Sequence, residues 1–458
     1  MPRRAVVSKS PSFFWSESFS NKTNMSLLAT SSTLTTEDVR RTILKNGLVV
    51  LTKELHTSPI VTSMIWYRVG SRNESIGQTG KSHFLEHMLF KGTERFKKGE
   101  IDLLTLKNGG GNNAFTSHDF TAYYFNFASD RWHVALDIEA DRMVNCTFEP
   151  DEFEAEKKVV IEELKTSLDS PWGLLLQETD AAAYKLHPYR NPIVGWLQDV
   201  ERASADEQQA YYRKYYHPNN AVLVLVGDFQ TDEVLERVEK TFSEIPIGPP
   251  PPEMVLNEPE QRGERRIVVR WRSRIPRLAV AYHAPRIAAR DSYALQLLGV
   301  ILSEGKASRL YQRMVEREQS VTFVTAEYGE SMDPTLFHVR AEARGEHPIE
   351  QIESSIHDEL RSIATQGVTP HEIDRAKHQI EAHFILSRER TLDQAILLGQ
   401  IETLDSLEYI DSYLSRMAAV TTDDIGDACS RYLRENNRTV AQLLSDGSQP
   451  GSEDAIED

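Results

Sequence analysis

Two histidines and a glutamate stand close together in the segment His83-Phe-Leu-Glu86-His87. Residues four apart on a helix lie on nearly the same face, so both imidazoles can bind one metal ion. Glu86 lies on the same side, where its carboxylate could take a proton from a water molecule on that ion. The order His-x-x-Glu-His reverses the commoner zinc motif His-Glu-x-x-His. The segment therefore predicts a helix that carries two zinc ligands and a general base.

A catalytic zinc ion needs a third protein ligand, because such sites combine three side chains with one open position. Residues 152–168 predict an amphipathic helix on which Glu156, Val160 and Glu163 share one side. A carboxylate beside apolar residues is partly buried, and a metal ion would remove the cost of that burial. Both glutamates are therefore candidates, although each is also compatible with an ordinary charge on a solvated helix face. The histidine pattern alone also arises by chance in helices.

The bulk composition describes an ordinary folded protein and limits its partners. With 40% apolar and 26% charged residues the chain can build a sizeable core. Its net charge of −17 argues against binding nucleic acid or an anionic membrane surface, since both need a basic face. No apolar run of about 18 residues is present, so no membrane-spanning helix is expected. The N-terminal region lacks the apolar stretch of a secretory signal, which favours a cytoplasmic protein, with an organelle transit peptide as the alternative.

The length of 458 residues predicts two domains, because single cores stop growing at roughly 250 to 300 residues. The four prolines at positions 249–252 cannot lie inside a helix or a central strand and are the obvious linker. The expected segments, in order, are a disordered tail over 1–37, a metal-binding domain over 38–248, a linker over 249–261, a second domain without the metal site over 262–445 and an acidic disordered tail over 446–458.

The two halves of the chain also look like copies of each other. Ser204 with its acidic successors, the Asn219-Asn220 pair and the following apolar run recur 217 positions later as Thr421, Asn436-Asn437 and Thr439-Val440. Each copy predicts a capped helix, a turn and a strand. The ungapped register favours duplication over chance similarity. The same shift carries His83 to an apolar stretch without ligands, so the second copy is expected to lack the metal.

These motifs together resemble the pitrilysin and insulinase family of zinc metallopeptidases, in its bacterial processing-peptidase-like branch. The likeness covers about residues 38–445 and includes, in order, Asn46-Gly-Leu, Gly70-Ser-Arg-Asn-Glu, His83 to Thr93, Gly110-Gly-Asn-Asn-Ala-Phe-Thr, Glu156 to Glu163, Tyr216-His-Pro-Asn-Asn and Ser308-Arg-Leu-Tyr. The resemblance implies an α+β fold of two homologous α/β domains, each an antiparallel-rich sheet flanked by helices, facing each other around a chamber.

The resemblance also implies a role for each residue of the metal motif. The family's distal ligand is the second glutamate of a Glu-Glu pair, so one zinc ion per chain would be held by His83, His87 and Glu163. Glu86 would be the catalytic base that assists the attack of zinc-bound water on a peptide bond. Glu156 would orient a ligand imidazole. The implied activity is that of a zinc endopeptidase that cleaves peptides or unfolded polypeptide segments.

The glycine-rich segment after residue 108 implies a substrate site. In the family the strand over residues 112–116 is an exposed edge onto which the substrate adds as an extra strand, held by main-chain hydrogen bonds. Asn113 and Ala114 are the residues expected to bind the peptide. The alternative is a plain hairpin edge without that role.

One departure from the family pattern lies in the second half. Active members carry an arginine and a tyrosine seven apart after the Ser-Arg-Leu-Tyr block, and these positions read Val315 and Thr322 here. A second family member without the metal motif is expected to supply the pair in a heterodimer, the other assembly being a homodimer. Arg309 or Tyr311 are alternative donors within this chain.

Two other functions remain open for a chain with this fold. The first is a non-catalytic scaffold subunit of a larger complex. It is disfavoured because a scaffold has no need of four residues in metal geometry. The second is a binding module for a metal other than zinc. It is disfavoured because two histidines and a glutamate with an open position suit zinc.

Overall fold

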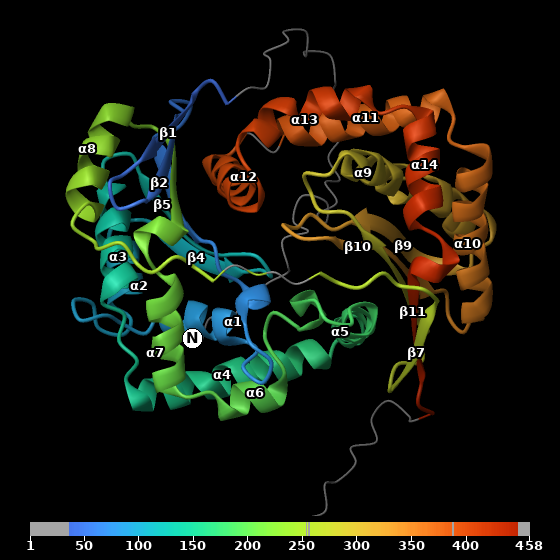
Figure 1. The fold of residues 1–458 in the computed structure, drawn as a ribbon, viewed down its shortest axis with the longest axis horizontal. Helices are drawn as coiled ribbons and strands as arrows, with labels where there is room; N and C mark the ends of the chain where they lie inside the picture. Colours follow the sequence, from blue (N-terminus) through green and yellow to red (C-terminus); the bar gives the residue numbers. More distant parts are fainter. Residues whose placement is uncertain (1–35, 253, 255–256, 387–388, 448–458) are drawn as a thin grey trace, which may run out of the picture. The chain divides into compact units, whose positions relative to one another are not determined.

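The computed structural model describes residues 36–252, 254, 257–386 and 389–447, and these form two compact units (Figure 1). Unit 1 comprises the described residues of Met1–Leu164, Pro192–Val255 and His383–Leu414. Unit 2 comprises those of Lys165–Asn191, Leu256–Ala382 and Ser415–Asp458. Each unit combines one sheet with helices, which confirms the expected pair of sheet-and-helix domains. Nearly all of the two predicted tails lies outside the described residues.

The sheet of unit 1 has the strand order β1-β2-β6-β3-β5-β4. All neighbours are antiparallel except β2 and β6. The strands are β1 (Val39–Ile43), β2 (Val49–Glu54), β3 (Ile60–Tyr67), β4 (Gly111–Thr116), β5 (Thr121–Ala128) and β6 (Ala221–Gly227). Every residue of the central strand β6 is buried, as its run of valine and leucine predicts. Strand β4 forms one edge of this sheet and pairs with β5 alone.

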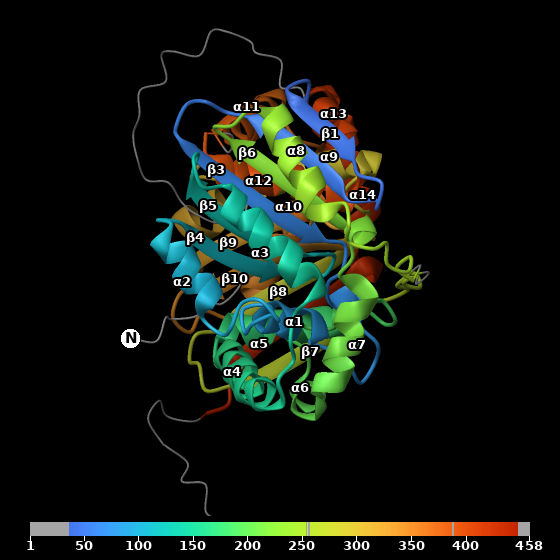
Figure 2. The same cartoon turned by 90° about the vertical axis from the view of Figure 1, so that its left-hand side faces the viewer.

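Helices cover both faces of this sheet. Figure 2 shows α2, α3 and α8 in front of the strands, and α12 packs on β3 and β6 from the other face. The helices of the first half of the chain are η1 (Ser71–Asn73), α1 (Lys81–Met88), α2 (Glu100–Lys107), α3 (His133–Val144), α4 (Pro150–Leu168), α5 (Pro171–Ala183), η2 (Pro188–Arg190), α6 (Leu197–Arg202), α7 (Ala205–Tyr215), η3 (Pro218–Asn220) and α8 (Thr231–Phe242).

The sheet of unit 2 has the strand order β7-β11-β8-β10-β9. Its strands are β7 (Arg265–Trp271), β8 (Arg277–Ala284), β9 (Val321–Tyr328), β10 (Thr335–Ala343) and β11 (Arg438–Ser445). The helices of the second half are α9 (Arg290–Ser303), the π-helix η4 (Tyr311–Arg317), α10 (Ile349–Gln366), α11 (Pro370–Leu386), α12 (Thr391–Leu404), α13 (Glu408–Ala419), α14 (Thr422–Tyr432) and η5 (Glu435–Asn437). None of the described helices is long and apolar enough to cross a membrane.

Neither unit is a continuous stretch of the chain. Helix α5 packs on β7, β8 and β11 and so belongs to unit 2, while α12 packs on β3 and β6 and belongs to unit 1. Each helix covers the apolar face of that unit's sheet, which is the physical reason for the exchange. The expected domain limits of 38–248 and 262–445 rest on the proline-rich linker between them and stay a prediction. The described residues between α8 and β7 form neither helix nor strand.

The predicted repeat is present as matching structure. The sequence shift that relates Ser204 to Thr421 also relates α7 to α14, η3 to η5 and β6 to β11. The hydroxyls of Ser204 and Thr421 cap their helices by accepting a hydrogen bond from a backbone amide three residues later. The Asn220 and Asn437 side chains donate to the carbonyls of Tyr215 and Tyr432 over 2.9 and 2.7 Å. The two halves therefore repeat both the elements and the bonds that fix the turn.

Candidate metal centre

Helix α1 carries the histidine motif, and its N-terminus is firmly held. The Glu74 carboxylate accepts hydrogen bonds from the backbone amides of Gly80 and Ser82, each over 2.7 Å. These amides begin the helix and would otherwise lack a partner inside it. The Gln208 side chain donates to the Lys81 carbonyl over 2.6 Å, and the Tyr211 hydroxyl lies 2.8 Å from that of Ser82. These contacts from a loop and from α7 fix the rotation of α1 and hence the direction of its histidines.

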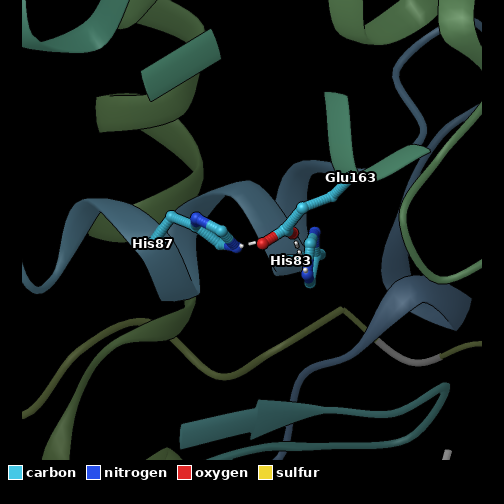
Figure 3. A group of neighbouring side chains, drawn as sticks. All are labelled: His83, His87 and Glu163. Atoms are coloured by element: carbon cyan, nitrogen blue, oxygen red, sulfur yellow. Dashed lines mark ion pairs between the residues drawn. The ribbon is translucent and has the colours of Figure 1, made fainter. Parts of the chain in front are cut away.

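The structure brings His83, His87 and Glu163 together (Figure 3). His83 and His87 project from α1, and the Glu163 carboxylate reaches them from α4. Oε2 of Glu163 lies 3.3 Å from Nε2 of His87 and 3.7 Å from Nε2 of His83. One potential ligand atom from each residue lies within 4.8 Å of the other two. Among the described residues this is the one cluster of three or more histidine, cysteine or acidic side chains that could hold a metal ion.

The distances and the donor set of this cluster fit zinc. Two ligand atoms on one tetrahedral zinc ion at about 2.0–2.1 Å lie roughly 3.3 Å apart. The two nitrogen–oxygen distances, 3.3 and 3.7 Å, are near this spacing, whereas a charge-assisted hydrogen bond spans about 2.7–2.9 Å. Burial and the neighbouring His87 lower the pKa of His83 well below its ordinary value, so His83 is neutral, which is the form that binds metals.

Glu156 lies behind His87, on the side away from Glu163. Its Oε1 is 2.9 Å from Nδ1 of His87, and its Oε2 pairs with Nζ of Lys91. Burial acts to raise the pKa of Glu156, but the bonds from His87 and Lys91 outweigh it and lower the pKa below its ordinary value. Because an ionised carboxylate only accepts, Nδ1 of His87 carries a hydrogen, which leaves Nε2 as the atom that can bind a metal ion. This is the arrangement that commonly orients a metal-binding imidazole. Burial acts to lower the pKa of His87, but the Glu156 and Glu163 carboxylates outweigh it and raise the pKa to about 10, so Nε2 must release a proton when it binds an ion.

Glu86 lies on α1 between the two histidines and is 9% exposed. Its Oε2 accepts a hydrogen bond of 2.5 Å from the hydroxyl of Thr116, the last residue of β4. Burial raises the pKa of Glu86 to about 7, against the lowering effects of His87 and Thr116. A carboxyl group of this kind beside a metal cluster is suited to proton transfer near neutral pH.

The two residues expected to bind the peptide lie on the edge strand β4. Asn113 is exposed, and Ala114 next to it is buried. Helix α1 packs against this strand, so the edge and the histidine cluster are neighbours within unit 1. The expected strand and its edge position are thus present, and peptide binding by the two residues stays a prediction.

The structure also places the residues that depart from the family pattern, all of them in unit 2. Val315 is half-buried in η4, and the exposed Thr322 of β9 donates a hydrogen bond to Oε1 of Glu342 over 3.1 Å. The alternative donor Arg309 already binds Glu372 over 2.6 Å and Glu359 over 3.2 Å. Two carboxylates therefore occupy its guanidinium, which makes it a poor donor to a substrate.

Two residues that support the site were missed by the sequence reasoning. Glu74 caps α1 and Thr116 contacts Glu86, and neither belongs to a periodic pattern. A signal for each was nevertheless present, because Glu74 ends the block that begins at Gly70 and Thr116 ends the block that begins at Gly110. Glu74 lies seven residues before the first residue of α1, so no capping signature at the helix start identifies it.

Two family models that match this chain both describe peptidase family M16. The family model described as "Insulinase (Peptidase family M16)" matches residues 49–195, which include all the residues of the metal cluster. The model described as "Peptidase M16 inactive domain" matches residues 202–380. Together the two matches span most of the chain.

Relatives along nearly the whole chain carry peptidase names. Zinc protease PqqE of Helicobacter pylori is 29% identical over 405 residues, which are 87% of this chain and 91% of that protein. A probable mitochondrial-processing peptidase subunit beta of Arabidopsis thaliana is 27% identical over 424 residues, which are 90% of this chain and 79% of that protein. The crystal structure of a protease from Helicobacter pylori superposes with a TM-score of 0.86 at 29% identity and covers 88% of this chain and 99% of that one. The chain therefore belongs to the pitrilysin and insulinase (M16) family of peptidases, in its processing-peptidase-like branch.

Proposed function

We propose that the chain is a zinc-dependent endopeptidase that cleaves peptides or unfolded polypeptide segments. The observation that carries this proposal is the convergence of His83, His87 and Glu163 from two separate helices, with the Glu86 carboxylate on the same helix as the histidines. The peptidase names of the relatives support it. A cluster of this composition gives three ligands and leaves one position for water or substrate.

The chemistry follows from the positions of the side chains. A bound zinc ion supplies Lewis acidity, which lowers the pKa of water and polarises the scissile carbonyl. His83, His87 and Glu163 would hold the ion, and Glu156 would keep the His87 ring in the orientation that presents Nε2. Glu86 would take a proton from the attacking water, with Oε1 the more basic oxygen because Thr116 donates to Oε2. It then returns the proton to the departing amine, as a general acid.

The edge strand β4 supplies the binding surface for the substrate in this proposal. An extended peptide adds beside β4 through main-chain hydrogen bonds, next to Asn113 and Ala114. This binding mode uses main-chain hydrogen bonds more than side-chain contacts, which suits unfolded polypeptide substrates. Because α1 packs against β4, a peptide bound at this edge lies near the catalytic carboxylate.

Val315 and Thr322 lead to a proposal about a partner. Neither side chain replaces the guanidinium or the phenol that family members place there, and Arg309 is already paired with two carboxylates. We infer that a second, metal-free family member supplies the arginine and tyrosine in a heterodimer. The relative named as a subunit beta supports an assembly of two related chains.

Addition of such a partner is expected to raise the kcat/KM of this chain for peptide cleavage by about 100-fold, since one well-placed donor to a developing oxyanion contributes 10²–10³-fold. The measurement is cleavage of a fluorogenic peptide by the chain alone and by the co-purified pair. A partner variant with its arginine changed to alanine is the matched control and should give no rise. Full activity of the chain alone, unchanged by the partner, would contradict the inferred assembly.

The second candidate is a scaffold subunit without turnover. The match of residues 202–380 to a domain described as inactive and the loss of the arginine and tyrosine favour it. The cluster of His83, His87 and Glu163 beside Glu86 disfavours it, because buried groups without a chemical role are costly to keep. A peptidase assay separates the two candidates.

Chelation tests the proposed function. Treatment with 1,10-phenanthroline is expected to abolish peptide cleavage by the pair, and readdition of one equivalent of zinc is expected to restore it, because the metal supplies the polarisation that no side chain replaces. A circular dichroism spectrum before and after chelation controls for unfolding. Cleavage that continues after the zinc has been removed would sink the proposal.

A further inference from the structure

Thr116 contacts the catalytic carboxylate but has no role of its own in the reaction proposed so far. Its hydroxyl donates to Oε2 of Glu86 over 2.5 Å, and its side chain is buried with 1% exposure. Among the described residues it is the one side chain that donates a hydrogen bond to Glu86. This bond therefore restricts the rotation of the Glu86 carboxylate.

The position of Thr116 makes that bond rigid. A β-branched side chain in a strand has restricted rotation about χ1. The backbone of Thr116 is paired with Thr121 of the adjacent strand β5, so its Cβ is held by the sheet. The hydroxyl has a single hydrogen, and donating it to Oε2 makes that oxygen less basic than Oε1.

Thr116 also joins the base to the proposed substrate edge. It ends the strand that contains Asn113 and Ala114, and alternation along a strand places Ala114 and Thr116 on the same face. Both side chains are buried, and α1 packs against this strand. The bond between Thr116 and Glu86 is thus a direct link from the edge strand to the helix that carries the metal motif.

We propose that Thr116 is a positioning residue that orients the Glu86 carboxylate for proton transfer and ties it to the strand where the peptide adds. The inference rests on the proposed peptidase function. Thr116 touches neither the substrate nor the metal cluster in this account, so it acts through Glu86 alone. Its loss should lower the rate of the chemical step and leave substrate binding unchanged.

The test compares Thr116→Val, which keeps the shape and removes the hydroxyl, with Thr116→Ser, which keeps the hydroxyl. Thr116→Val is expected to lower kcat by about 10–100-fold with KM and zinc content unchanged, because a small misplacement of a catalytic group costs about that much. Thr116→Ser should keep kcat within about threefold of the unchanged chain, since its hydroxyl can still donate to the carboxylate. If Thr116→Val does not fold, Thr116→Ala carries the same comparison.

Thr121→Val is the matched control. Thr121 is a buried threonine directly opposite Thr116, and its hydroxyl donates to the carbonyl of Val69 over 2.9 Å. Its loss should shift the melting temperature at least as much as Thr116→Val and leave kcat near the original value. Equal losses of kcat in Thr116→Val and Thr116→Ser, or an unchanged kcat in Thr116→Val, would overturn the positioning role.

The outcome separates this inference from the proposed function. If the unchanged chain cleaves peptide, Glu86→Gln does not and Thr116→Val does at full rate, only the role of Thr116 fails. If Glu86→Gln cleaves as well as the unchanged chain, the proposed function itself fails and takes the role of Thr116 with it.

Discussion

Replacing Glu163 with glutamine is expected to remove zinc from the chain and to abolish peptide cleavage. Among the described residues, the Glu163 carboxylate is the one acidic group placed against Nε2 of both His83 and His87. A neutral amide of the same shape lacks the charge that binds a divalent cation. The zinc affinity should fall by more than about 100-fold, since even the loss of an outer partner of a ligand costs 10–100-fold. Zinc per chain after dialysis, measured by plasma mass spectrometry, and a peptide assay check the expectation.

The neighbouring residue gives this test a matched control. Glu162 stands one position earlier on α4 and is exposed, whereas Glu163 is half-buried. Because adjacent helical residues point about 100° apart, Glu162→Gln should retain zinc and activity. Equal zinc content in Glu163→Gln and Glu162→Gln would show that the carboxylate is not a ligand.

The second large effect is expected from Glu86→Gln. This change keeps the size of the side chain, and Thr116 can still donate to its carbonyl oxygen, but the amide cannot take a proton. Peptide cleavage should fall by about 10²–10⁴-fold, the usual contribution of a general base. Zinc content should stay unchanged, because the metal cluster consists of other residues. Zinc analysis and kcat on the same preparation test both parts.

Either of two results would contradict the role of Glu86. Undiminished turnover would mean that another group accepts the proton. Loss of zinc together with activity would mean that Glu86 is a ligand and that the cluster has a different composition.

Local spacing explains why part of the site could be predicted from the sequence. His83 and His87 are four residues apart, so the helical repeat alone places their side chains on one face. Glu163 lies on another helix, and its meeting with the histidines depends on how α4 packs against α1. No short-range pattern contains that information, and only the family resemblance distinguished Glu163 from Glu156 as the ligand. Thr116 was missed for the same reason, because its contact with Glu86 joins a strand to a helix.

The fold shows the same limit. The repeat of a capped helix, a turn and a strand was predictable because each element has local signals, from the Ser204 cap to the apolar strand after Asn220. The exchange of α5 and α12 between the two units was not predictable. An apolar helix face indicates that a helix must be covered, but it does not indicate which sheet covers it.

The central claim is that two imidazoles and one carboxylate bind a single zinc ion. X-ray absorption at the zinc edge of the purified chain tests it most directly. The account predicts a four-coordinate ion with two imidazole nitrogens at about 2.0–2.1 Å and the remaining ligands oxygen, one of them from a carboxylate at about 2.0–2.2 Å. A sulfur ligand at about 2.3 Å, or a spectrum with fewer than two imidazoles, would contradict it.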